Sequence, residues 1–249
     1  MSERVLMLGA TSGIAVALCD VMAARGCDLI LAGRNVTRLE QQAAELRARH
    51  RVTVFVEPFE ALDFDHHDAF FERCLAHFDG SLDIVVLCHA YLTDQQLTQT
   101  DFREARRTID VTFTSAVSIL GIAANYFERR RRGMIAAISS VAGERGRMSN
   151  YTYGASKAGL TVWLEGLRNR LCHAGVHVLT IKPGFVDTPM ARGRVSPNSP
   201  LLATPRRVAR AIDRAIRRRR DVLTTPWFWR PIMFLVRLTP EPIFKRLKL

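Results

Sequence analysis

Short apolar runs alternate with longer amphipathic stretches along most of the chain. Six of these runs are rich in Val, Ile or Leu, and they cover residues 4–8, 28–32, 52–56, 82–88, 134–140 and 176–182. Strands of a parallel sheet have this continuous apolar character because both of their faces are buried. Between the runs, helical spacing of apolar residues predicts helices over roughly 12–25, 36–49, 66–78, 101–129, 150–174 and 205–218. The alternation predicts an α/β fold with helices on both faces of a doubly wound parallel sheet.

The same pattern indicates a single domain. No internal repeat or low-complexity linker divides the 249 residues, so we assign residues 1–224 to one domain and residues 225–249 to a C-terminal extension. Residues 189–204 contain three prolines and show little periodicity, which predicts a mobile loop over a site.

Composition narrows the class of protein. With 48% hydrophobic and 24% charged residues, the chain can bury a full core, which excludes disordered, collagen-like and small disulfide-rich proteins. Five cysteines without a CxxC spacing favour a reducing compartment, and we expect no bound metal. No apolar run reaches the ~18 residues of a membrane span, and the first residues do not resemble a signal peptide. These features predict a soluble cytoplasmic protein.

The net charge of +12 is concentrated near the C-terminus. Residues 206–220 contain eight Arg and one Asp, and residues 225–249 contain five basic residues and one Glu. The asymmetry favours an anionic partner, such as a phosphate or a lipid surface. The alternative is that these stretches are solvated helix faces. No nucleic-acid-binding motif accompanies the charge, so we expect no nucleic-acid partner.

A glycine-rich turn, GATSGIA, follows the first predicted strand. Glycines allow a tight turn and close approach of the backbone to a pyrophosphate, which the positive end of the next helix also attracts. Such turns are common, but the position after the first strand favours dinucleotide binding. The candidate cofactor-binding residues of this turn are Gly9, Thr11, Ser12, Gly13 and Ile14.

Gly33 and Arg34 follow the second predicted strand. An NAD site uses a carboxylate here to bind the ribose 2′-hydroxyl. A guanidinium instead suits the 2′-phosphate of NADP through charge-assisted hydrogen bonds. A solvated Arg at a strand end is the alternative. Together with the glycine-rich turn, Arg34 predicts that NADP(H) is preferred over NAD(H).

Tyr153 and Lys157 are suited to acid–base chemistry. They are four residues apart and share one face of a predicted helix. The ammonium is expected to stabilise the phenolate and to lower the pKa of Tyr153 from ~10. A phenol activated in this way is able to protonate a carbonyl oxygen while hydride reaches the carbon. The alternative is a chance match, since a Tyr and a Lys at this spacing occur in many helices, and the pair alone favours that alternative. Tyr151 is a competing phenol, but it lies six residues from Lys157 and off that face.

These motifs, with Ser140 before Tyr153 and the segment PGFVDT after the sixth strand, resemble the short-chain dehydrogenase/reductase family over residues 4–224. The resemblance implies a Rossmann-type fold and an enzyme that interconverts a ketone and a secondary alcohol. It implies that Ser140 hydrogen-bonds the carbonyl, that Tyr153 is the acid and base, and that Lys157 binds the nicotinamide ribose. Further cofactor contacts implied by position are Glu60, Ala90, Pro183, Gly184, Val186 and Thr188.

Two positions depart from the pattern of that family. Its Asn-Asn-Ala-Gly reads Cys88-His89-Ala90-Tyr91 here, and Tyr91 lacks the conformational freedom of Gly. Its fourth-helix Asn, which helps to carry protons to the active-site Lys, is replaced by Thr112, whose side chain is shorter. These departures motivate an alternative of another class, a nucleotide-binding subunit with weak or no catalysis.

A narrower resemblance covers residues 139–160, the FEALDFDHH segment and the terminal TPEPIFKRLKL. These stretches are similar to the decaprenylphosphoryl-2-keto-ribose reductase subgroup, which reduces a keto-sugar on a polyprenyl phosphate beside a flavin oxidase. The resemblance implies a lipid-linked carbonyl substrate and a flavin oxidase partner. A reductase of hydrophobic ketones or lipid intermediates is the alternative. We also expect a homo-oligomer.

The C-terminal extension contains five aromatic residues among 25, interleaved with cations. Such a segment suits the interface of an anionic membrane, which predicts peripheral attachment at the inner face of the membrane. The alternative is that the extension caps the substrate pocket or packs in an oligomer. Its prolines exclude one continuous amphipathic helix.

Overall fold

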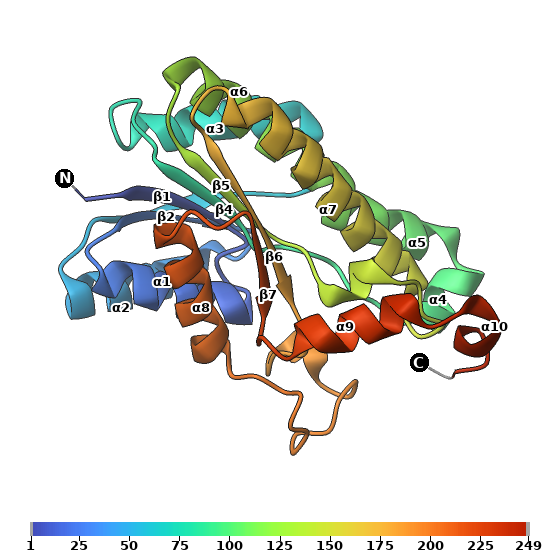
Figure 1. Cartoon of the computed structure of the whole chain (residues 1–249). Helices are drawn as coiled ribbons and strands as arrows, with labels where there is room; N and C mark the ends of the chain where they lie inside the picture. The colour runs from blue at the N-terminus through green and yellow to red at the C-terminus, as the bar shows by residue number, and fades with distance from the viewer. Residues whose placement is uncertain (1, 248–249) are drawn as a thin grey trace.

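Parallel strands form a seven-stranded central sheet, and helices cover both of its faces (Figure 1). The computed structural model describes residues 2–247. In spatial order β3-β2-β1-β4-β5-β6-β7, the strands are β1 (Arg4–Leu8), β2 (Asp28–Gly33), β3 (Val54–Pro58), β4 (Ile84–Leu87), β5 (Met134–Ile138), β6 (His177–Pro183) and β7 (Val222–Thr225). The helices are α1 (Gly13–Ala24), α2 (Val36–His50), α3 (His67–Ala76), α4 (Gln95–Thr100), α5 (Phe102–Ile109), α6 (Ser115–Arg130), α7 (Tyr151–Cys172), α8 (Pro205–Arg217), α9 (Trp229–Leu238) and α10 (Glu241–Phe244).

Successive strand residues pack into two different apolar cores. In β1, Val5 and Met7 belong to the core that includes α1, α2 and α8. Leu6 and Leu8 belong to the core that includes α3, α6 and α7. All four side chains are fully buried. Burial on both faces explains the continuous apolar sequence of the strands, and the predicted α/β class and doubly wound parallel sheet are confirmed.

The strand order reverses at β1, which pairs with both β2 and β4. In open parallel sheets, ligands bind in the crevice outside the carboxyl ends of the strands at such a point. The glycine-rich turn follows β1, and the segment that begins at Cys88 follows β4. The topology therefore brings these two segments to one end of the sheet.

The six predicted strands are all present, and their ends lie within two residues of the prediction. The prediction missed β7, which is only four residues long and begins five residues after α8. It also missed α4, α9 and α10, which are short or contain proline. The helix predicted over 101–129 is divided into α5, a π-helical turn at Asp110–Thr114, and α6.

One helical stretch, Phe102–Arg130, is long and apolar enough to cross a membrane by length and composition alone. The sequence analysis had found no apolar run of the length that a membrane span needs, so this stretch differs from that expectation. Within this stretch, Ile119, Leu120 and Phe127 are fully buried in the core beneath the sheet. We therefore assign the stretch to the core of the fold.

The chain beyond β7 folds against the segments that follow β5 and β6 (Figure 1). Trp229 and Met233 of α9 are buried in a small apolar cluster with Val141 and Phe185. A Cβ at Gly184 would lie 1.9 Å from the indole nitrogen of Trp229, so only glycine permits this contact. The extension is thus packed directly onto loops at the carboxyl end of the sheet.

Arg145 fixes the far end of α9. Its guanidinium donates hydrogen bonds to the carbonyl oxygens of Val236 (2.7 Å) and Thr239 (2.6 Å), which are exposed at the helix end. It also pairs with the carboxylate of Glu241 (2.8 Å) and lies 3.8 Å from the ring centre of Phe244. One side chain from the segment after β5 therefore holds both α9 and α10.

Candidate active site

Two adjoining cavities of about 440 Å³ and 260 Å³ lie at the carboxyl ends of the strands, and they share Thr11, Ser12, Cys88, Ala90 and Met190. They therefore form one cleft. Every residue predicted to bind cofactor or to catalyse lines it. The larger cavity contains Thr11, Ser12, Gly13, Ile14, Ala90, Ser140, Tyr153, Lys157, Pro183, Gly184, Val186 and Thr188. The smaller contains Gly9, Thr11, Ser12, Arg34, Glu60 and Ala90.

The glycine-rich turn brings the backbone close to the cleft. Gly9 has a φ of +75°, which L-residues rarely adopt, and a Cβ there would lie 2.7 Å from the main-chain nitrogen of His89. The Ser12 hydroxyl caps α1 by accepting a hydrogen bond from the main-chain nitrogen of Ala15 (3.4 Å). The N-terminus of α1 thus lies at the cleft, where its positive end favours a phosphate group.

Two exposed arginines line the cleft near the start of α2. Arg34 lines the smaller cavity, and Arg38, within the first turn of the helix, lines the larger one. Asn35 caps α2 by accepting a hydrogen bond from the main-chain nitrogen of Arg38 (3.0 Å). The sequence analysis missed Arg38, because Arg34 precedes the helix and no helical spacing links the two residues. Glu60 lies across the same smaller cavity.

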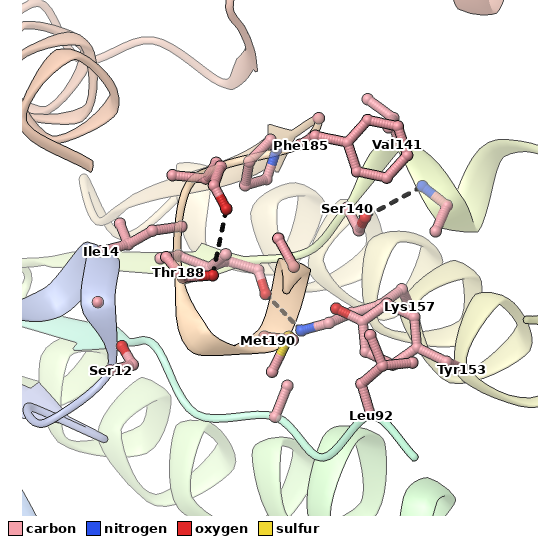
Figure 2. Close-up of a pocket in the computed structure, with 18 of the residues that line it drawn as sticks. Ser12, Ile14, Leu92, Ser140, Val141, Tyr153, Lys157, Phe185, Thr188 and Met190 are labelled. Atoms are coloured by element: carbon pink, nitrogen blue, oxygen red, sulfur yellow. Dashed lines mark hydrogen bonds between the residues drawn. The ribbon is translucent and has the colours of Figure 1, made fainter. Parts of the chain in front are cut away.

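Ser140, Tyr153 and Lys157 come together in the larger cavity (Figure 2). The Ser140 hydroxyl accepts a hydrogen bond from the main-chain nitrogen of Ala142 (3.1 Å), which fixes its direction. The Lys157 ammonium donates a hydrogen bond to the carbonyl oxygen of Ile138 (2.6 Å) and lies 5.8 Å from the ring centre of Tyr153. In Figure 2, Ser12, Ile14 and Thr188 lie on the other side of the cavity from Ser140 and Tyr153.

Close backbone packing fixes the position of Ser140 relative to Tyr153. A Cβ at Gly143 would lie 2.6 Å from the main-chain nitrogen of Ala158, so the turn after Ser140 lies directly against α7. Tyr153 is 9% exposed within the cavity, whereas Tyr151 is 45% exposed and outside it. The choice between the two phenols made from helix spacing therefore agrees with their positions.

Burial controls the protonation of Tyr153 and Lys157. Desolvation raises the pKa of Tyr153, and the Arg194 and Ser140 side chains offset only part of the increase. Desolvation also lowers the pKa of Lys157 to about 7, against an opposing effect of Cys88. The prediction that the pKa of Tyr153 is lowered is therefore wrong, because desolvation outweighs the opposing effects of Arg194 and Ser140. A phenol that retains its proton at neutral pH is suited to donate it.

Thr112, at the position where the family has Asn, is buried in the π-helical turn between α5 and α6. Its hydroxyl accepts a hydrogen bond from the main-chain nitrogen of Tyr91 (3.0 Å) and donates one to the carbonyl oxygen of the same residue (3.1 Å). The Tyr91 hydroxyl in turn donates a hydrogen bond to Glu104 (2.8 Å). Thr112 therefore anchors the cleft-lining segment after β4, and π-helical turns are often found at functional sites.

His89, also at a position where the family has Asn, lines the smaller cavity. Its Nε2 lies 2.9 Å from the Ser115 hydroxyl, while its buried Nδ1 has no hydrogen-bond partner among residues 2–247. Burial, Lys157 and His67 lower the pKa of His89 to about 3. The ring is therefore neutral at physiological pH and leaves one nitrogen available to a ligand.

The sequence analysis assigned no role to three residues of the larger cavity, Arg147, Asn150 and Arg194, and it considered Trp229 only as part of the extension. Arg147 and Asn150 precede α7 and belong to no motif. Arg194 lies in the loop that was predicted to cover a site. Trp229 lies in the extension, for which a pocket cap was one of the predicted roles.

A comparison of sequences places the chain among known enzymes. Residues 3–198 match the family model described as short chain dehydrogenase. An uncharacterized oxidoreductase of Mycobacterium tuberculosis is 36% identical over 243 residues, which cover 98% of this chain and 96% of that protein. The relationship therefore extends through the C-terminal extension.

Solved structures show the same fold. A short-chain dehydrogenase from Sphingobium yanoikuyae in complex with NADPH has a TM-score of 0.78 and 22% identity, with coverage of 98% of this chain and 96% of that chain. The bulky-bulky ketone specific alcohol dehydrogenase from Comamonas testosteroni has a TM-score of 0.79 and 20% identity, with coverage of 98% and 94%. With the family model matching most of its length, the chain belongs to the short-chain dehydrogenase family and is an oxidoreductase acting on CH–OH or C=O groups.

Proposed function

We propose that this protein reduces a ketone to a secondary alcohol with NADPH. The observation that carries the proposal is the meeting of Ser140, Tyr153 and Lys157 in a cavity continuous with the glycine-rich turn and Arg34. A proton donor and a dinucleotide-shaped cleft are the two components that hydride transfer to a carbonyl requires.

The residues of the cleft fit a nicotinamide dinucleotide. Gly9 lets the turn after β1 pack directly against His89 at the edge of the cleft, and the N-terminus of α1 suits the pyrophosphate. Arg34 and Arg38 suit the 2′-phosphate of NADPH, because a guanidinium matches phosphate geometry. By the family resemblance, Glu60 would contact the adenine and Thr188 the nicotinamide end, and both residues line the cleft. When bound, the cofactor supplies the hydride.

Side chains of the protein donate the proton that the carbonyl oxygen needs and stabilise the charge that develops on it. Tyr153 donates the proton of its hydroxyl to the carbonyl oxygen, and its raised pKa keeps that proton in place until the oxygen becomes basic. Ser140 donates a hydrogen bond to the same oxygen and stabilises the charge that develops there. Lys157, held by the carbonyl of Ile138, binds the cofactor ribose and provides positive charge beside Tyr153.

The substrate that we propose is a bulky keto-sugar linked to a lipid phosphate, in line with the subgroup resemblance. Leu92, Val141, Phe185 and Trp229 give the larger cavity apolar walls that accommodate a hydrophobic substrate. A hydrophobic ketone without the sugar is the second candidate. The resemblance also suggests a flavin oxidase partner and a homo-oligomer.

The outer surface of the extension supports peripheral contact with an anionic membrane from the cytoplasm. Trp227 is 71% exposed, and Phe234, Leu235 and Leu238 are each more than half exposed. Trp229 of the same segment is 4% exposed and lines the cavity. The two roles considered for the extension therefore fall on different side chains, the membrane role on Trp227 and the pocket-cap role on Trp229.

Carbonyl-dependent oxidation of NADPH tests the proposal. Purified protein should oxidise NADPH only when a ketone from a panel is added, including a polyprenyl-phosphate keto-pentose in detergent. Binding of NADPH without oxidation by any member of the panel would instead support the nucleotide-binding subunit.

A further inference from the structure

We infer that Arg147 and Arg194 form a subsite for an anionic group on the substrate, at the end of the larger cavity beside the start of α7. The inference rests on the proposed reductase function and extends it to the chemical class of the substrate. That class is a carbonyl compound that carries a carboxylate or a phosphate and at least one hydroxyl group.

Buried polar atoms without partners mark this end of the cavity. Nε of Arg147 and Oδ1 of Asn150 are buried, and neither has a hydrogen-bond partner among residues 2–247. The indole nitrogen of Trp229, whose side chain is 4% exposed, is also buried and unpartnered. The indole nitrogen packs against Gly184, where a Cβ would lie 1.9 Å from it, so it is covered by the backbone. Because leaving a buried donor or acceptor unsatisfied is costly, the two atoms of Arg147 and Asn150 in one cavity wall indicate that a ligand satisfies them.

The charge of this subsite is positive and uncompensated. Burial lowers the pKa of Arg147, and no acidic group acts against this effect. Arg194 donates a hydrogen bond to the carbonyl oxygen of Thr93 (2.9 Å), and its charge acts on Tyr153. By contrast Arg145, close by in sequence, pairs with Glu241 at 2.8 Å. A partly buried guanidinium beside a cavity is a natural partner for a carboxylate or phosphate.

The hydrogen-bonding groups of this subsite predict which groups the ligand carries in addition to its negative charge. Arg147 offers hydrogen-bond donors, whereas Oδ1 of Asn150 offers an acceptor. An anionic oxygen satisfies Arg147, and only a ligand with an N–H or O–H group satisfies Asn150. The start of α7, a helix of 22 residues with no acidic residue in its first turn, adds a weaker preference for negative charge.

The position of this subsite separates it from the cofactor phosphates. Arg147 and Asn150 lie six and three residues before Tyr153 and line the larger cavity only. Arg34, proposed for the 2′-phosphate, lines the smaller cavity only. Arg38 and the start of α1, also proposed for the cofactor phosphates, do line the larger cavity, but Ser12 and Ile14 lie on its other side from Ser140 and Tyr153 (Figure 2). The anionic group therefore belongs to the molecule whose carbonyl meets Tyr153.

Matched charged and neutral ketones test the subsite. The probes are xylulose 5-phosphate against xylulose, and 6-oxoheptanoate against its methyl ester, titrated into the full chain saturated with NADP⁺, which has no hydride to transfer and therefore leaves the ketone unreacted. In at least one pair, the charged member should bind roughly tenfold more tightly or better than the neutral one. Arg147→Gln should remove most of that preference, and Arg147→Lys should retain part of it. The phosphate and carboxylate pairs together show which anion the subsite prefers.

Two further variants keep the test decisive. Arg192→Gln removes an exposed guanidinium from the same loop as Arg194 but outside the cavity, so the preference should be unchanged. Arg194→Gln, also at an exposed position, should weaken the preference even if Arg147→Gln does not fold.

The outcomes separate the subsite from the reductase. The inference is overturned if neither charged ketone binds more tightly than its neutral counterpart, or if the preference survives in both Arg147→Gln and Arg194→Gln. In either case, NADPH oxidation by neutral ketones would still support the reductase. If no ketone is reduced but the preference depends on Arg147, the subsite stands and the proposed reductase function fails.

Discussion

The two ends of the cleft are built in different ways. At the cofactor end, short segments that follow β1, β2, β3 and β4 converge because the strand order reverses at β1. At the substrate end, side chains come from the segment after β5, the loop 189–204 and α9. The cofactor end thus follows from topology and backbone shape, whereas the substrate end depends on side chains that the tertiary structure brings together.

The two ends also differ in whether the bound cofactor accounts for their arginines. Arg34 and Arg38 lie where the phosphate of a cofactor is expected. Arg147 and Arg194 lie beside the proton donor, where cofactor chemistry does not require a cation. Four measurements test this contrast between a cofactor end built by the topology of the sheet and a substrate end built by side chains from distant segments.

The largest effect is expected for Tyr153→Phe. Because only the transition state uses the proton, turnover should fall by roughly 10²–10⁴-fold while NADPH binding stays nearly unchanged. Steady-state rates and an NADPH titration measure the two effects. Tyr151→Phe, at an exposed position outside the cavity, is the matched control and should be mild. Equal losses in both variants would show that Tyr153 is not the donor.

The next largest effect concerns the cofactor end. A charge-assisted contact worth ~1.5–3 kcal/mol corresponds to a preference for NADPH over NADH of roughly 10–150-fold. Arg34→Leu should remove most of it, and Arg38→Leu should remove a smaller part. Dissociation constants for both cofactors measure this preference. A natural protein that binds the two cofactors equally would refute the role of Arg34.

The pH dependence of reduction is expected to follow Lys157. Its pKa of about 7 means that the ammonium is charged below pH 7 and neutral above it, so turnover should fall as pH rises, by up to about tenfold per unit. Its buried neighbours do not titrate in this range, because the pKa values of Cys88 and His89 lie at about 12 and about 3 and that of Tyr153 is raised. A rate that stays constant or rises between pH 7 and pH 9 contradicts this assignment of Lys157.

The smallest effect separates the two tryptophans of the extension. Trp227→Ala removes an exposed ring, and a loss of about 1 kcal/mol would weaken binding to anionic vesicles roughly fivefold without changing turnover of a small soluble ketone. Trp229→Ala opens the cavity wall and should lower turnover with little effect on vesicle binding. Flotation at low and high salt measures the first effect, because high salt weakens charge attraction. A natural protein that does not bind vesicles even at low salt excludes the membrane role.

The sequence predicted the fold, and its candidate cofactor residues do line the cleft, because both the strands and the glycine-rich turn are marked by local signals. Apolar runs mark the strands, and Gly9 is required by a backbone conformation that few other residues adopt. Helix spacing favoured Tyr153 over Tyr151, and of these two residues only Tyr153 lines the cleft.

The substrate end escaped prediction for physical reasons. Arg147 and Trp229 are 82 residues apart and meet only through the packing of α9 against the loop after β5. The sign of the pKa shift of Tyr153 was also missed, since spacing reveals a neighbouring cation but not the desolvation that outweighs it. The hydroxyl of Thr112 binds the backbone of Tyr91, a partner that no motif could reveal.

Transfer of deuterium from NADPH labelled at C4 of the nicotinamide tests the central claim most directly. The alcohol formed from a ketone substrate should carry one deuterium on the carbinol carbon when the transferred position is labelled, as detected by mass spectrometry, and Tyr153→Phe should form correspondingly little labelled alcohol. Recovery of the ketone unchanged, or of alcohol without deuterium from either stereoisomer of the labelled cofactor, would contradict the assignment of this cleft to carbonyl reduction.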